Sequence, residues 1–127
     1  MAYDLLQWPA SVYPGEANAE CPEAIPTLDK LLLTLKAHGP SPPGYGFKNL
    51  GKGRKGLWQI NLKVKKRQVR VLYAPYGTSI VLFRIHKKSS PQEQERAYEL
   101  AMSRKTQYEF EMAAQEKASH GGNRSSH

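Results

Sequence analysis

The sequence predicts an α+β domain in which helices pack on one face of a small antiparallel sheet. Three patterns point to this fold class: leucines at helical spacing before residue 36, three stretches of strand-like alternation between residues 57 and 86, and a second helical pattern after residue 90. With 127 residues, the chain is long enough for one domain with a sizeable core. We expect this domain to span residues 1–118 and a disordered tail to occupy residues 119–127.

The first part of the chain is expected to form an irregular arm followed by a helix. The prolines in residues 1–26 argue against regular structure there. From Thr27, which can cap a helix, apolar residues recur three and four positions apart. These residues are Leu28, Leu31, Leu32 and Leu35. Gly39 and Pro40 should end the helix, and the segment 39–46, rich in proline and glycine, should form a loop.

A meander of three antiparallel strands is expected next. Apolar and polar residues alternate in residues 57–65, and residues 68–74 and 78–86 alternate in the same way. Short connections between consecutive strands imply antiparallel pairing, and an N-terminal strand could join the sheet. One face of the sheet should be the core, with Val81, Phe83 and Ile85 sharing a face of the third strand. The other face is the expected working surface and carries Lys63, Lys65, Arg70, Arg84 and His86.

The last predicted element is a long helix. Ser90 can cap it, Pro91 suits its first turn, and Glu93 completes a capping box. A single helical stripe then holds Ala97, Leu100, Ala101, Arg104 and Tyr108. The helical pattern weakens after residue 110.

The distribution of charge suggests a polyanionic partner. The chain has a formal net charge of +8, yet residues 30–92 contain 14 basic residues and no acid, whereas residues 1–29 contain five acids and no lysine or arginine. Such a segment favours binding to nucleic acid. A membrane surface is a weaker candidate, because the segment has no basic amphipathic helix. No apolar run is long enough for a transmembrane helix, and we expect a cytoplasmic protein.

The residue types present argue against a metal site or a bound cofactor. The single cysteine, Cys21, excludes an intrachain disulfide, and the four histidines show no paired ligand spacing. Paired carboxylates are absent from the predicted sheet, so hydrolysis there would depend on Lys, Arg, His or Tyr. This restriction suits metal-independent RNA cleavage, in which the 2′-hydroxyl of the RNA attacks the adjacent phosphate.

Basic residues in strands and turns are the candidate RNA contacts. The segment Gly51–Gly56 is both glycine-rich and basic, and it can be read as a plain connector or as a phosphate-contacting loop. We favour a flexible loop that also touches nucleic acid. The predicted RNA-binding residues are Lys52, Arg54, Lys55, Lys63, Lys65, Lys66, Arg67 and Arg84.

Four short motifs follow one another in a specific order. They are Asn49-Leu50, Gly56-Leu57-Trp58-Gln59-Ile60, Val69-Arg70-Val71-Leu72-Tyr73, and Ile80-Val81-Leu82-Phe83 with Lys87-Lys88. Over residues 48–108 this arrangement resembles the RelE/HigB toxin superfamily, in particular its HigB-like, phage-derived branch. The resemblance implies a RelE-like fold. It also implies a toxin of a type II toxin–antitoxin pair, many of which cleave mRNA on the ribosome without a metal ion.

The resemblance assigns roles to several basic residues. Arg70 matches an arginine that contacts the scissile phosphate, and Lys87 and Lys88 match a basic pair that supports the transition state. In the family the first strand often supplies further cations, but here Gln59 and Asn61 occupy two of those positions.

One expected residue type is missing near the start of the last helix. Family members tend to have a tyrosine or histidine there, for which His86 or Tyr108 could substitute. The candidate catalytic residues are therefore Arg70, Lys87, Lys88 and His86.

The expected function is that of an mRNA endonuclease toxin whose partners are mRNA, the ribosome and an antitoxin of the helix-turn-helix type. The leading alternative is a non-catalytic protein on the same fold, either a gyrase-type target inhibitor or an RNA-binding module. A family member without activity is a third possibility. A neighbouring reading frame that encodes a helix-turn-helix protein would favour the toxin.

Overall fold

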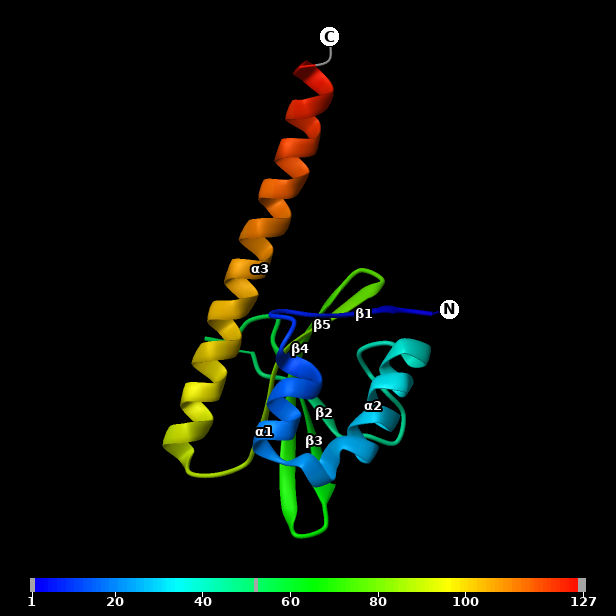
Figure 1. The fold of residues 1–127 in the computed structure, drawn as a ribbon, viewed down its shortest axis with the longest axis vertical. Helices are drawn as coiled ribbons and strands as arrows, with labels where there is room; N and C mark the ends of the chain where they lie inside the picture. Colours follow the sequence, from blue (N-terminus) through cyan, green and yellow to red (C-terminus); the bar gives the residue numbers. More distant parts are fainter. Residues whose placement is uncertain (1, 52, 126–127) are drawn as a thin grey trace.

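A five-stranded mixed sheet forms the centre of the fold (Figure 1). The computed structural model describes residues 2–51 and 53–125, with side chains up to residue 118. The strands are β1 (Asp4–Gln7), β2 (Phe47–Asn49), β3 (Trp58–Val64), β4 (Arg67–Tyr76) and β5 (Ser79–Lys87). They are arranged in the order β1-β5-β4-β3-β2, and all neighbours are antiparallel except β1 and β5, which are parallel.

The sheet is larger than the predicted three-stranded meander. β3, β4 and β5 form that meander, and β1 supplies an N-terminal strand at one edge. β2 lies at the other edge and was not predicted. Its three residues are all exposed, so they show no alternation of buried and exposed positions from which a strand could be recognised.

Helices cover both faces of the sheet, which contradicts the prediction of a single covered face (Figure 1). α1 (Ala17–Glu20) and α2 (Ile25–His38) belong to one hydrophobic core, and α3 (Pro91–Ser125) belongs to the other. The second core exists because the α3 side of the sheet is polar only near one end. Its other end is apolar and packs against α3 through Leu57, Leu72, Ala74, Val81 and Phe83.

A β-bulge explains why simple alternation fails along β5. The pairing of β4 with β5 shifts between Leu72 and Tyr73, so β5 contains an extra residue at this point. As a result, Val81 and Phe83 join the α3 core while Ile85 joins the opposite core. The prediction that these three residues share one face is therefore wrong.

The N-terminal arm is more regular than the sequence predicts. After β1 it forms a helical turn η1 (Val12–Glu16), then α1, then η2 (Pro22–Ala24). α2 begins at Ile25 with a proline in its first turn and no side-chain cap, so Thr27 is not the N-cap. The arm contributes fully buried side chains to the core, namely Val12, Ala17, Cys21 and Ala24.

Two glutamates of this arm bond to the edge of β5 where β1 has ended. The backbone N–H of Ile85 donates to Glu16 Oε1 at 3.2 Å, and that of Lys87 donates to Glu20 Oε1 at 3.1 Å. Residues two apart in a strand present their N–H groups to the same edge, and residues four apart in a helix share a face. One helical face of the arm therefore continues along the edge of β5 from the point where β1 ends.

α3 starts as predicted and is long. The backbone N–H of Glu93 donates to the Ser90 hydroxyl at 3.2 Å, which confirms the cap. The helix continues past residue 118, the predicted end of the domain, and its C-terminal part projects beyond the rest of the chain (Figure 1). Within the described residues, no helix has the length and apolar character needed to cross a membrane.

Candidate functional site

A buried polar cluster joins three elements at the polar end of the α3 side of the sheet. Arg70 of β4 donates through Nη1 to the Tyr98 hydroxyl of α3 at 3.3 Å, and that hydroxyl donates to Gln59 Oε1 of β3 at 2.6 Å. Gln94 Nε2, one helical turn before Tyr98, donates to the same hydroxyl at 2.8 Å. The exposed fractions of Arg70, Tyr98 and Gln59 are 8%, 6% and 2%. A guanidinium and a phenol are thus held together out of solvent.

Strand register determines which polar side chains can meet here. In the ladder, Asn61 of β3 pairs with Arg70 and Arg70 pairs with His86 of β5. Gln59 and Asn61 are two residues apart, so they share a face, and Gln59 Nε2 donates to Asn61 Oδ1 at 3.3 Å. The row of Asn61, Arg70 and His86 crosses three strands directly beside the first turns of α3.

Tyr98 is the residue that sequence analysis missed. The family pattern predicts a tyrosine or histidine near the start of the last helix, with His86 or Tyr108 as substitutes, so it does not point to Tyr98. Its signal is its place between Ala97 and Ala101, on the sheet-facing side of α3, where a buried tyrosine needs a partner for its hydroxyl. Tyr108 instead packs with Trp8, Tyr76 and Phe83 at the other end of the core, so it does not reach Arg70.

The loop before β3 closes over Tyr98. The Arg54 guanidinium lies over the Tyr98 ring, 4.6 Å from its centroid, and forms an ion pair with Glu95 of α3. In this structure Arg54 fastens the first turns of α3 to the loop at residues 51–57, and its predicted contact with RNA stays a prediction.

His86 is buried next to the cluster and is neutral at ordinary pH. Its side chain is 3% exposed, and Nε2 has no hydrogen-bond partner among the described residues. Burial, with a smaller contribution from the Arg84 charge, lowers the pKa of His86 to about 4. A neutral imidazole can accept a proton, so the position retains the chemistry of a weak base.

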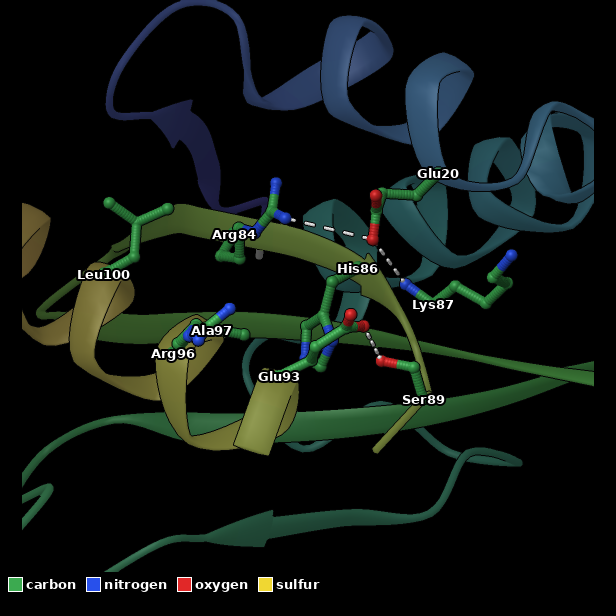
Figure 2. Close-up of a pocket in the computed structure, with 9 residues that line it drawn as sticks. All are labelled: Glu20, Arg84, His86, Lys87, Ser89, Glu93, Arg96, Ala97 and Leu100. Carbon is green, nitrogen blue, oxygen red and sulfur yellow. Dashed lines mark hydrogen bonds and ion pairs between the residues drawn. The ribbon is translucent and has the colours of Figure 1, made fainter. Parts of the chain in front are cut away.

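A cavity of about 310 Å³ opens on the other side of His86, between β5, α1 and α3 (Figure 2). Figure 2 shows Glu20 reaching toward it from α1, and Glu93 and Arg96 from the first turns of α3. Lys87 also lines it, while Lys88 is exposed at the end of β5. The predicted catalytic residues therefore divide: Arg70 and His86 are buried under α3, and the two lysines lie at its margin.

The predicted RNA-binding residues also divide into two groups. Lys55, Lys63, Lys65 and Lys66 are exposed, whereas Lys52 lies outside the described residues. Arg67 pairs with Glu23 at 3.2 Å, and Arg84 pairs with Glu16 at 3.1 Å and with Glu20 at 3.8 Å. The acidic arm thus neutralises part of the charge of the acid-free segment. The sequence does not reveal these ion pairs, because their members lie far apart along the chain. Lysines carry most of its unpaired charge.

The described residues offer no metal centre. Nowhere in them do three His, Cys, Asp or Glu side chains come together in a way that could hold a metal ion. The chemistry available in the polar cluster is that of a guanidinium, a phenol, amides and a neutral imidazole.

Comparison with known proteins gives a likeness of fold. No protein-family model and no curated protein matches the chain. The structure is similar to that of a mutant of the E. coli toxin RelE in the free state, with a TM-score of 0.50 and 15% sequence identity. The match covers 78% of this chain and 97% of that chain. At this identity the likeness shows the fold alone: the chain has a RelE-like α+β fold, while the HigB-like branch stays a prediction.

Proposed function

We propose that this protein is the toxin of a type II toxin–antitoxin system and that it cleaves mRNA without a metal ion. The observation that supports this most directly is the contact between Arg70 and the Tyr98 hydroxyl. It joins a cation suited to a phosphate with a group that can transfer a proton, on a RelE-like sheet. The resemblance in sequence assigned the phosphate contact to Arg70 and expected a tyrosine or histidine near the start of the last helix; we propose that Tyr98, two turns into α3, takes that role.

In the proposed reaction the 2′-oxygen of the RNA attacks the adjacent phosphorus and the 5′-oxygen leaves. Arg70 would hold the phosphate and stabilise the charge that develops on its oxygens. Tyr98 and His86 are the candidates to move protons, since the phenol can donate and the neutral imidazole can accept. Lys87 and Lys88 would add positive charge at the margin of the site.

Access to this site requires movement of α3. Arg70, Tyr98 and His86 are almost fully buried, so RNA can meet them only when the first turns of the helix separate from the sheet. The adjoining surface is already open and carries exposed Asn61 and Lys63. We propose that this surface, with the hairpin lysines Lys65 and Lys66, receives the RNA backbone first.

The partners follow from the same proposal. They would be mRNA, the ribosome on which cleavage occurs, and a co-encoded antitoxin of the helix-turn-helix type. We propose the cytoplasm as the site of action and no cofactor.

A non-catalytic binder on the same fold is the second candidate function. Amides at Gln59 and Asn61 favour it, because these positions would hold cations in many mRNA-cleaving members of the family that the sequence resembles. Such a protein could inhibit a gyrase-type target or bind RNA without cleaving it.

The decisive experiment compares two tyrosines of α3. RNA 5′ ends are mapped after induced expression, and cleavage by purified protein is measured with and without ribosomes. Tyr98→Phe should lower the rate about a hundredfold, because it removes the hydroxyl bonded to Arg70. Tyr108→Phe is the matched control and should cleave like wild type.

Two outcomes would contradict the proposal, the first for the role of Tyr98 and the second for RNA cleavage itself. Equal rates for Tyr98→Phe and wild type would remove Tyr98 from the site. The absence of any cleavage by wild type, even with ribosomes, would favour the binder.

A further inference from the structure

The outward face of α3 carries a stripe with the spacing of a coiled-coil seam. Its positions follow one another at intervals of four, three, four, three and four residues, and every one is exposed. They are Glu99, Ser103, Thr106, Phe110, Ala113 and Lys117. The stripe lies on the opposite side of the helix from Ala97, Ala101 and Tyr108, which pack against the sheet. The domain therefore does not obstruct it.

The centre of the stripe is a shallow groove beside an exposed aromatic ring. The groove is lined by Met102, Ser103, Thr106, Gln107 and Phe110. Phe110 is 74% exposed, which is the highest exposed fraction of any large hydrophobic side chain among the described residues. Four of the lining residues stand at positions i, i+3, i+4 and i+7, which is the arrangement of a hole that receives one side chain of a facing helix.

The stripe is complementary to itself when the second helix runs the opposite way. Its six members form three pairs, each placed symmetrically about residue 108: Glu99 with Lys117, Ser103 with Ala113, and Thr106 with Phe110. In an antiparallel arrangement every pair forms two equivalent layers between the copies, one on each side of the two-fold axis. Each layer then joins opposite charges, two small side chains, or the phenylalanine ring and a smaller residue.

We propose that two copies of this chain associate through α3 as an antiparallel helix pair, with the two-fold axis crossing near residue 108. Phe110 of each copy fills the groove of the other, and the small residues on either side allow the helices to approach closely. The seam spans about 27 Å of helix, from residue 99 to residue 117.

The end layers determine the direction of pairing. In the antiparallel arrangement Glu99 of each copy faces Lys117 of the other, whereas a parallel arrangement would place like charges together. Exposed ion pairs contribute little affinity, so these layers act mainly on orientation, and affinity depends on Phe110. One aromatic side chain per copy makes a small interface, so we expect a dissociation constant on the order of tens of micromolar. The dimer does not rest on the proposed RNA cleavage.

Sedimentation equilibrium of the purified full chain, from low micromolar to several hundred micromolar, tests the proposal. Wild type should pass from monomer to dimer over this range. Phe110→Asp should weaken the dimer at least about tenfold, because it places a charge in the groove. Leu33→Asp is the matched control: Leu33 is 66% exposed on α2, away from the stripe, and its replacement should leave the dimer unchanged.

Charge exchange tests the direction. Glu99→Lys and Lys117→Glu should each weaken the dimer at low salt, and the double variant should recover wild-type affinity. A monomer at all concentrations, or a dimer unaffected by Phe110→Asp, would overturn the proposal. A double variant no better than the single variants would overturn the antiparallel register.

Discussion

Replacing His86 by glutamine should change how stability depends on pH. His86 is buried between β5 and α3, with Arg84 and Arg70 as positive neighbours and Glu20 as a negative one. Its pKa is about 4 in the folded protein and 6.5 in an unfolded reference chain. Between these pH values the unfolded chain binds a proton that the folded protein excludes, so acidification favours unfolding.

The expected size follows from the two pKa values. Their separation corresponds to about 3 kcal/mol of stability, since one pKa unit is about 1.4 kcal/mol. This contribution is fully present above roughly pH 7 and declines as pH falls toward 4. Glutamine cannot take up the proton, so His86→Gln should lose less stability on acidification than wild type does.

The assay is urea unfolding of both proteins at intervals from pH 7.5 to pH 4.5, followed by circular dichroism. Both proteins contain the same carboxylates, so their contribution to the pH dependence is removed when the unfolding free energy of wild type is subtracted from that of the variant. That difference should shift toward the variant by about 2–3 kcal/mol over this range. A difference independent of pH would show that His86 is accessible and titrates normally, which would refute the account of a closed α3.

Three further predictions concern Arg70, Glu16 and the exposed lysines. Arg70→Ala should slow RNA cleavage about a hundredfold, and Arg70→Lys should recover only part of the rate because lysine lacks the guanidinium fork. Both rates are measured as initial rates on a labelled RNA. If Arg70→Ala cleaves at the wild-type rate, the site lies elsewhere. Glu16→Gln should destabilise the fold by about 2 kcal/mol in thermal unfolding, since Glu16 pairs with both Arg84 and Arg104, and an unchanged melting temperature would contradict this. Affinity for single-stranded RNA should fall with salt at a log–log slope near −0.7 per phosphate neutralised, and binding insensitive to salt would argue against a lysine-based contact.

Sequence patterns predicted the elements whose side chains alternate or recur strongly. The meander from β3 to β5, the leucine stripe of α2 and the Ser90 cap of α3 all carry such local signals. β2 carries none, because it is short and exposed. The bulge in β5, opposite the step from Leu72 to Tyr73, also escaped prediction, since an extra residue in one strand is visible only against its partner.

The candidate site was harder to predict because it is assembled by tertiary contacts. Arg70 was expected at the surface, and it is buried because α3 crosses the face that its strand presents. Tyr98 could be placed only once the helix had been docked on the sheet. The pairing of Glu16 with Arg84 joins residues nearly 70 positions apart, which no window of sequence reveals.

We expect the carboxylates of Glu16 and Glu20 to protect the protein against self-association of its sheet, because they bond to backbone N–H groups on the edge of β5. An open strand edge has unpaired backbone N–H and C=O groups, which can form hydrogen bonds with a strand of another molecule. Such edges lead to aggregation. Here Ile85 and Lys87 present N–H groups on the edge of β5 beyond the end of β1, and these groups donate to two glutamates of a helical segment instead of to a strand. A chain shortened to begin at α2 would lose β1 together with these two carboxylates, and it would expose the whole edge of β5. Its expected failure is fibrillar association through β5, with the hydrophobic core on the α3 side still formed.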